Sequence, residues 1–166
     1  MIPQPAWTRF LPEAFVLNMA TLGRLGYFRA PGTWGSAAGV IWYTVMGVPA
    51  GPLWALVMTV AGIYLAFALC GEAEMRLHKV DPQEVILDEA ACVPVVFIGM
   101  HDIIAAGGAW LVFLLGFALF RLFDIAKPFG ISRIQRLTGG AGVVGDDLAA
   151  AVVSCGVLHA LLRLTP

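Results

Sequence analysis

This sequence has few charged residues. Only 13% of its 166 residues are Asp, Glu, Lys or Arg, whereas 60% are hydrophobic. An ordinary soluble domain has roughly 25% charged and 45–50% apolar residues, so water is not the main solvent of this chain. The formal net charge of −1 averages over a very uneven distribution and says little about partners. No nucleic-acid partner is expected.

Cysteine and histidine are also scarce. Cys70, Cys92 and Cys155 are odd in number and lie in apolar runs, which excludes a disulfide framework and is typical of small packing residues. The three histidines form no paired metal or acid–base motif, so none is assigned to catalysis. The first residues lack a basic stretch before a short apolar core, so no cleaved signal peptide is expected.

Long apolar runs are abundant, and they are uncharged except for Asp88 and Glu89 near the start of the third. Each is about 15 to 19 residues long, near the ~20 that a helix needs to cross a ~30 Å hydrocarbon core, and they cover residues 34–48, 53–71, 85–100, 103–120 and 148–162. The first two are separated only by a Pro-Ala-Gly-Pro turn, which predicts a tight helical hairpin. The pattern predicts one all-α domain over residues 1–166, a polytopic membrane bundle of about five helices. The short third run either crosses or only re-enters.

The charged residues gather in three segments on one side of these helices. Segments 1–33, 72–89 and 121–147 hold nine of the ten Lys and Arg residues, the exception being Arg163. The positive-inside rule assigns this side to the cytoplasm. Of the acidic residues, only Asp102 falls on the opposite side, where nothing in the sequence explains it.

Two acidic pairs lie at the boundary of apolar helices, Asp88-Glu89 and Asp146-Asp147. An unpaired carboxylate in such a place is costly and tends to mark function. Hard divalent cations such as Mg²⁺ prefer carboxylate oxygens and keep water or substrate phosphate in their shell, so two pairs from different helices predict an open metal site. Structural pairing with arginine, or capping of helices, is the competing interpretation.

A third group follows the fourth apolar run. Arg121, Asp124 and Lys127 are spaced by three, which would place them on one flank of a helix that Pro128 should end. Arg offers a planar fork of donors for phosphate oxygens and Lys a compact charge, while Asp124 could complete a metal shell or hold the two bases. An i,i+3 ion pair alone would be commonplace.

Four motifs follow one another along the chain, reading PGTWGS at 31–36, DE at 88–89, FRLFDIAKP at 120–128 and GAGVVGDD at 140–147. In this order they resemble the motifs of the phosphatidylglycerophosphatase A family. The chain departs from the family pattern at Tyr27-Phe28, Cys92 and Gly130, which affects backbone shape more than charge. The resemblance implies Mg²⁺-dependent hydrolysis of the terminal phosphomonoester of phosphatidylglycerophosphate to phosphatidylglycerol and phosphate. It also implies a multi-pass protein of the bacterial inner membrane, in glycerophospholipid biosynthesis, with its active site facing the cytoplasm.

On this resemblance, residues receive the following roles. The catalytic and metal-binding candidates are the carboxylates Asp88, Glu89, Asp124, Asp146 and Asp147. Arg121 and Lys127 are expected to neutralise the phosphoryl oxygens. Arg29 and Thr33, just before the first apolar run, are further substrate-binding candidates, although capping of that helix is the favoured role of the Thr33 hydroxyl.

Two alternatives stay open at this point. A small membrane transporter or assembly protein would use buried carboxylates to carry ions or pair helices, although no inverted internal repeat is evident. A phosphatase for phosphatidic acid, lysophosphatidic acid or another lipid phosphomonoester would need the same site. The attacking group, the number of metal ions and the oligomeric state are not readable from the sequence.

Overall fold

Three long helices form the frame of the molecule. The computed structural model describes residues 4–128 and 140–163, and this part is helical with no strand. Helix α4 (Pro52–Leu77), the helix His101–Ala126 and helix α8 (Gly140–Arg163) have 26, 26 and 24 residues and are long and apolar enough to cross a membrane. At 1.5 Å per residue each reaches roughly 36–39 Å. The predicted all-α membrane protein is therefore confirmed.

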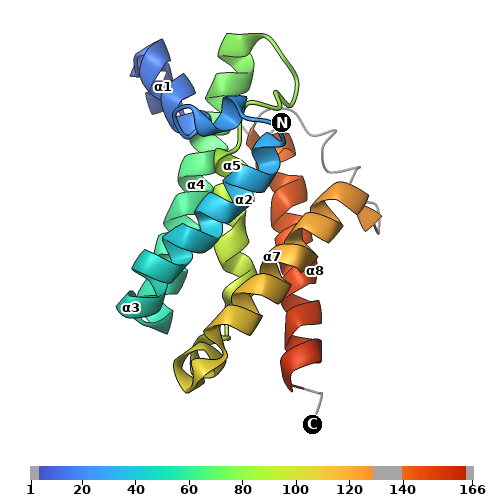
Figure 1. Cartoon of the computed structure of the whole chain (residues 1–166). Helices are drawn as coiled ribbons and strands as arrows, with labels where there is room; N and C mark the ends of the chain where they lie inside the picture. Colours follow the sequence, from blue (N-terminus) through green and yellow to red (C-terminus); the bar gives the residue numbers. More distant parts are fainter. Residues whose placement is uncertain (1–3, 129–139, 164–166) are drawn as a thin grey trace.

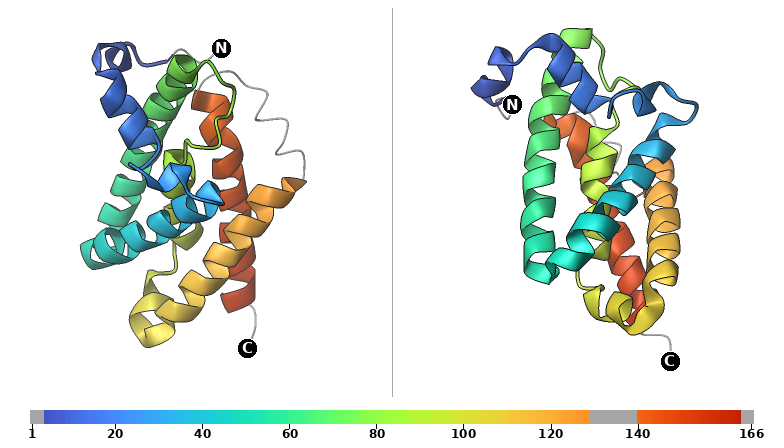
Figure 2. Two further views of the ribbon diagram at one scale, coloured as in Figure 1. Left: turned by 45° about the horizontal axis from the view of Figure 1, so that its top comes forward. Right: turned by 60° about the vertical axis from the view of Figure 1, so that its left-hand side comes forward.

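Helix α2 (Pro31–Trp42) leads into α4 through a hairpin (Figures 1 and 2). It continues through a π-helical turn, Tyr43–Gly47, and the short α3 (Val48–Ala50). Gly51 then reverses the chain at φ +83°, a conformation that favours glycine, and Pro52 opens α4 with the backbone angle that a first helical residue needs. The predicted reversal of the chain is confirmed, with Gly51 as its turning point, but α2 packs against α5 and α7 rather than closely along α4.

The third apolar run is the least regular. It forms the six-residue α5 (Leu87–Cys92) and a 3-10 turn, Val93–Phe97, which is buried throughout. Pro94 lacks the N–H that a continuing α-helix would use, which favours the tighter turn. This segment passes through the middle of the bundle, in contact with α2, α4 and α8. Among the described residues three helices reach spanning length, and the count of about five crossings stays a prediction.

The fourth run begins with α6 (His101–Ile103) and a π-helical turn, Ile104–Gly108, before α7 (Ala109–Ala126). At the same end Arg163 Nη2, in the last turn of α8, donates to Asp102 Oδ1 at 2.7 Å and to the Gly99 carbonyl at 2.6 Å. The two charges that the sequence left alone on this side therefore pair with each other.

The N-terminal segment lies across the opposite end (Figure 2) and comprises η1 (Ala6–Phe10), α1 (Glu13–Ala20) and η2 (Leu25–Tyr27). A buried polar cluster joins it to α4. Thr8 Oγ1 donates to Glu72 Oε2 at 2.9 Å, while Arg76 donates to Glu72 Oε1 at 2.8 Å and to the Thr8 carbonyl at 3.1 Å. Because both carboxylate oxygens have partners, the buried charge of Glu72 is compensated.

Small residues let α2 approach α5 closely. A Cβ atom on Gly35 would lie 2.6 Å from Glu89 Oε2 and 2.8 Å from the Ile86 carbonyl oxygen, and one on Gly39 would lie 2.5 Å from the Ala90 carbonyl oxygen. Close backbone approach through small residues is the usual way that membrane helices pack. Gly35 of the first motif thus places α2 against the acidic turn of α5, and Gly39 brings it close to the next turn.

Gly35→Ala is expected to lower thermal stability and displace Glu89. Overpacking of this kind costs about 1–3 kcal/mol, because the Ile86 backbone cannot move aside as a side-chain end can. Gly156→Ala on α8 is the matched control, since its added Cβ meets nothing within 4 Å. Thermal unfolding of the two variants in detergent measures the difference. Equal melting temperatures would contradict the packing described here.

Candidate active site

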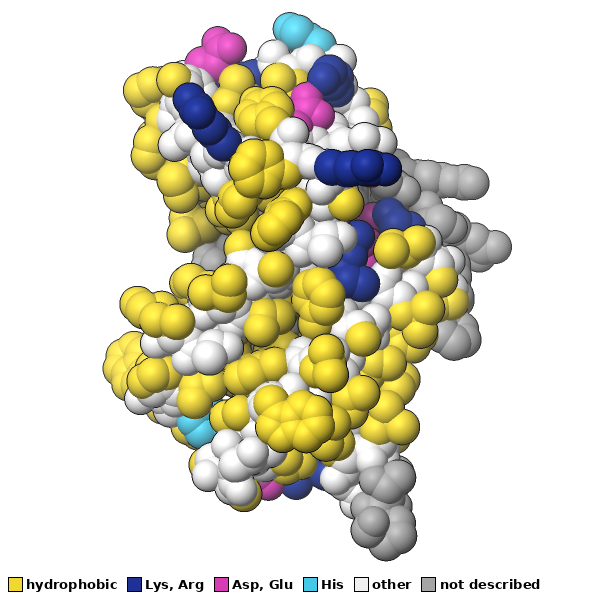
Figure 3. Space-filling model, in the orientation of Figure 1, with side chains coloured by type: hydrophobic (Ala, Val, Ile, Leu, Met, Phe, Trp, Pro, Cys, Tyr) yellow, Lys and Arg dark blue, Asp and Glu magenta, His cyan; other side chains and the backbone are white. Residues whose placement is uncertain are grey.

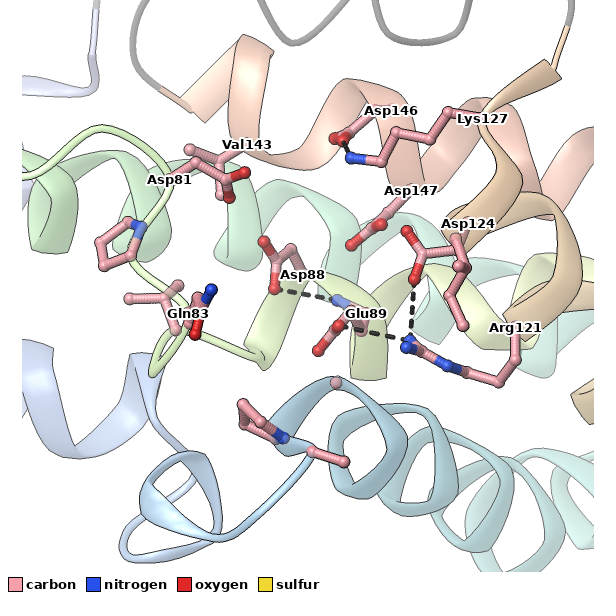
Figure 4. Close-up of a pocket in the computed structure, with 16 residues that line it drawn as sticks. Asp81, Gln83, Asp88, Glu89, Arg121, Asp124, Lys127, Val143, Asp146 and Asp147 are labelled. Atoms are coloured by element: carbon pink, nitrogen blue, oxygen red, sulfur yellow. Dashed lines mark hydrogen bonds and ion pairs between the residues drawn. The ribbon is translucent and has the colours of Figure 1, made fainter.

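One polar pocket opens at the end of the bundle where α2 begins. Its volume is about 340 Å³, and it lies between the start of α2, the loop that follows α4, and helices α5, α7 and α8 (Figure 4). Its polar lining residues are Asp81, Gln83, Asp88, Glu89, Arg121, Asp124, Lys127, Asp146 and Asp147. Segments far apart in the sequence therefore meet at one site.

All five predicted carboxylates reach this pocket. Asp88 and Glu89 stand in the first turn of α5, Asp124 in the last turn of α7, and Asp146 and Asp147 in the N-terminal half of α8. The four aspartates are buried, with between 5% and 9% of their surface exposed. The structure brings the two acidic pairs together as the sequence predicted, while their roles in catalysis stay a prediction.

Arg121 links three helices. Its Nη1 atom donates to Asp124 Oδ2 at 2.8 Å, to Ser36 Oγ at 3.3 Å and to Glu89 Oε1 at 3.4 Å. The contact with Asp124 follows from the i,i+3 spacing on α7, whereas those with Ser36 on α2 and Glu89 on α5 depend on tertiary packing. The guanidinium is thus held at the pocket wall by partners on both sides (Figure 4).

Lys127 lies just beyond the helix rather than on its flank. Helix α7 ends at Ala126, and Lys127 takes a left-handed conformation at φ 41° before Pro128. Its Nζ atom donates to Asp146 Oδ2 on α8. Burial by itself would lower the pKa of Lys127, but the hydrogen bond and the charge of Asp146 outweigh it and raise this pKa. The side chain is therefore a permanent cation at the pocket.

Arg29 and Thr33 do not line the pocket. Both are exposed, and the Arg29 carbonyl accepts a hydrogen bond from Trp34 Nε1 at 3.2 Å. The prediction that Thr33 caps the helix is wrong, because α2 already begins at Pro31, which has the fixed φ of a first helical residue. Thr33 consequently lies inside the first turn.

Asp81 and Gln83 line the pocket although the sequence did not single them out. They stand in the connection between α4 and α5, and the Asp81 backbone N–H donates to Glu74 Oε1 at 3.2 Å. The sequence predicts that segment 72–89 lies on the charged side of the helices, with site roles only for Asp88 and Glu89. Their place in the sequence could have indicated this role, since Asp81 and Gln83 closely precede the Asp88-Glu89 pair in the same charged segment.

The pocket has the donor chemistry of a hard cation site. Among the described residues, six carboxylates and two cationic side chains line it. Oε2 of Glu89 is buried and has no hydrogen-bond partner among the described residues. Clustered carboxylates repel one another unless a cation or protons compensate them, and an all-oxygen set suits Mg²⁺ rather than a soft metal. Within residues 4–128 and 140–163, no group of three or more Asp, Glu, His or Cys side chains is arranged so that it could already hold a metal ion.

A helical membrane protein with carboxylates, an arginine and a lysine in one pocket has the features of a membrane phosphatase. Comparison with known proteins agrees with this class. The sequence model of the family PgpA, phosphatidylglycerophosphatase A, matches residues 18–162. The chain belongs to the phosphatidylglycerophosphatase A family, and it is a lipid phosphatase.

Three relatives illustrate the similarity. The phosphatidylglycerophosphatase A of Haemophilus influenzae is 36% identical over 137 residues, covering 80% of this chain and 78% of the relative. That of Escherichia coli K12 is 33% identical over 133 residues, covering 78% and 72%. A putative phosphatidylinositol-3-phosphatase of Bacteroides thetaiotaomicron is 34% identical over 131 residues, covering 75% and 79%. No solved structure matches the chain. These relatives favour an enzyme over the transporter or assembly alternative.

Proposed function

We propose that the protein hydrolyses the terminal phosphomonoester of phosphatidylglycerophosphate, releasing phosphatidylglycerol and inorganic phosphate for glycerophospholipid biosynthesis. Two relatives carry the name of this activity. The observation that carries the proposal is the convergence of five predicted carboxylates, Arg121 and Lys127 on one pocket at the end of an apolar helical bundle. A phosphate group needs both cationic donors and a means of holding a metal, and this pocket offers both.

Mg²⁺ is the proposed cofactor. Asp88, Glu89, Asp124, Asp146 and Asp147 are the residues that would hold it, and the unpartnered Glu89 Oε2 supports this assignment. When bound, the ion neutralises phosphoryl charge and lowers the pKa of a coordinated water. Since Arg121 occupies one oxygen of Asp124 and Lys127 one oxygen of Asp146, these two carboxylates each have one oxygen outside those pairs.

The two bases would bind the phosphoryl oxygens. Arg121 contacts Ser36, Glu89 and Asp124 through Nη1, so Nη2 is not engaged by these three partners. Lys127 has three donor positions, of which Asp146 takes one. Each base can therefore keep its carboxylate partner and still donate to a phosphate. Such pre-positioned donors stabilise the charge of a transferring phosphoryl group.

We place the pocket on the cytoplasmic side of the bacterial inner membrane. The segments of the sequence at this end hold nine of the ten Lys and Arg residues, which supports a cytoplasmic orientation. The membrane itself follows from the three helices of spanning length. The bacterial sources of the named relatives support the inner membrane.

A phosphoinositide phosphomonoester is a second candidate substrate. The relative from Bacteroides thetaiotaomicron is named as a putative phosphatidylinositol-3-phosphatase, and it resembles this chain about as closely as the other two do. Phosphatidylinositol 3-phosphate, like phosphatidylglycerophosphate, carries a phosphomonoester on a headgroup that is joined to the lipid by a phosphodiester. The charged groups of the pocket suit both lipids, so a direct comparison of their hydrolysis rates is needed to choose between them.

The test is a substrate panel with purified protein in detergent and Mg²⁺. Phosphate release is measured from phosphatidylglycerophosphate, phosphatidylinositol 3-phosphate and phosphatidic acid at equal surface concentrations. We expect the highest kcat/KM with phosphatidylglycerophosphate. A preference for the inositol lipid would replace the proposed substrate by the second candidate, and no release from any of the three by well-folded protein would contradict the proposal.

A further inference from the structure

The mouth of the pocket has two unlike edges. Asp81 and Gln83 form an exposed polar edge. Pro31 at the start of α2 and Ile125 near the end of α7 form an apolar edge, and Ile125 is 73% exposed. A site that takes only water-soluble substrates has no need of an exposed isoleucine at its rim. The apolar edge therefore points toward the membrane rather than the water.

An apolar stripe along α7 leads to this edge. Trp110, Leu114, Leu122 and Ile125 are 69%, 60%, 57% and 73% exposed, and their spacing places them along one side of the helix. Since α7 belongs to a helix long and apolar enough to cross the membrane, this side faces lipid. The stripe ends at Ile125, which also lines the pocket.

Helix α2 presents a similar surface next to α7. Trp34 and Ile41 on α2 are 46% and 63% exposed, and Val45 in the π-helical turn that follows is 60% exposed. Helices α2 and α7 are in contact. Figure 3 shows this face of the molecule, where basic and acidic side chains are visible in a recess with hydrophobic side chains below and beside it. The charged pocket is thus reached through an apolar surface.

The depth of this opening matches that of lipid headgroups. Ile125 is the last residue but one of the candidate span His101–Ala126. Trp34 lies in the first turn of α2 and contacts Phe28 edge to face, with 6.0 Å between the ring centroids. Aromatic side chains gather where the hydrocarbon gives way to headgroups. A lipid that stays in the bilayer would present its phosphate at this level.

We propose that the pocket opens sideways into the bilayer between α2 and α7, and that the lipid substrate enters there with its acyl chains along the α7 stripe. This inference rests on the proposed function, because it assumes a phosphomonoester lipid as substrate. Sideways entry lets the phosphate reach Arg121 and Lys127 while the acyl chains stay in hydrocarbon. Entry across the polar edge would instead expose those chains to water, which the hydrophobic effect opposes.

Leu122→Gln tests the opening without touching the pocket lining. The protein is reconstituted in nanodiscs and assayed with a long-chain phosphatidylglycerophosphate in the bilayer and with a dihexanoyl form added from water. We expect kcat/KM to fall about tenfold for the long-chain lipid, mainly through KM, because an apolar contact with the chain is lost. For the short-chain form the value should stay within about twofold, since little chain contact is made.

Val152→Gln on α8 is the matched control, because Val152 is also 57% exposed. It should leave both substrates unaffected. Equal loss on both substrates in Leu122→Gln, or no loss on the long-chain lipid, would overturn the sideways opening while leaving the proposed function intact. Failure of the unmodified protein to hydrolyse either form would overturn the proposed function together with this inference.

Discussion

Asp147→Asn is expected to reduce phosphate release at least about 100-fold, since even residues that only support metal ligands cost 10- to 100-fold. Asp147 is 5% exposed at the pocket, and neither Arg121 nor Lys127 pairs with it in the described part of the chain. Its charge is therefore available to a cation. The substitution removes one of several buried carboxylates that repel one another. The free energy of unfolding of the metal-free protein should therefore stay equal or rise. Measured on the same preparation, activity should fall while the melting temperature of the metal-free protein stays equal or rises.

Asp102→Asn provides the comparison at the other end of the bundle. Asp102 pairs with Arg163, but their side chains are 62% and 40% exposed, so the pair contributes little to stability. This variant should keep its phosphatase activity. Near-normal activity in folded Asp147→Asn, or an equal loss in both variants, would contradict the assignment of Asp147 to the site.

Arg121→Lys is expected to reduce kcat about 10- to 100-fold although it conserves the charge. Nη1 of the guanidinium contacts Ser36, Glu89 and Asp124, which leaves Nη2 for the phosphate, whereas lysine has one nitrogen for both tasks and cannot bind the phosphate while it stays anchored. A phosphate would therefore meet a charge that is no longer held in position. Steady-state phosphate release at saturating lipid measures the effect.

Arg76→Lys is the control for this substitution. Arg76 pairs with Glu72 at the same end of the bundle, and its side chain is 16% exposed against 17% for Arg121. Replacing it should disturb the N-terminal segment to a similar degree while leaving turnover within about threefold, because it contacts no pocket residue. If both variants lose turnover equally, the role of Arg121 is structural only.

The helical frame could be predicted because its signal is local. A run of about 20 uncharged apolar residues has few alternatives to a membrane helix, and α4 and α8 follow directly from it. The segment 85–100 was less predictable, since its length reads as a short helix. In the structure Pro94 and close packing against the glycine face of α2 give instead one and a half turns of α5 and a 3-10 turn.

The site could be predicted in part for the same reason. The pair Arg121 and Asp124 follows from helical spacing, and the two acidic pairs stand out against apolar surroundings. The partner of Lys127 could not be predicted, because Asp146 lies on another helix and is brought near by folding. Arg29 was assigned by its nearness in sequence to the first motif, whereas in the structure its side chain is exposed and outside the pocket lining.

The central claim is that the carboxylate pocket supports metal-dependent hydrolysis of a lipid phosphomonoester. The most direct measurement follows phosphate release from phosphatidylglycerophosphate by the purified protein in Mg²⁺, after EDTA, and after Mg²⁺ is restored. We expect release to stop with EDTA and to return with Mg²⁺ in the unmodified protein, and to stay low throughout in Asp147→Asn. Release that continues unchanged in EDTA would contradict the account.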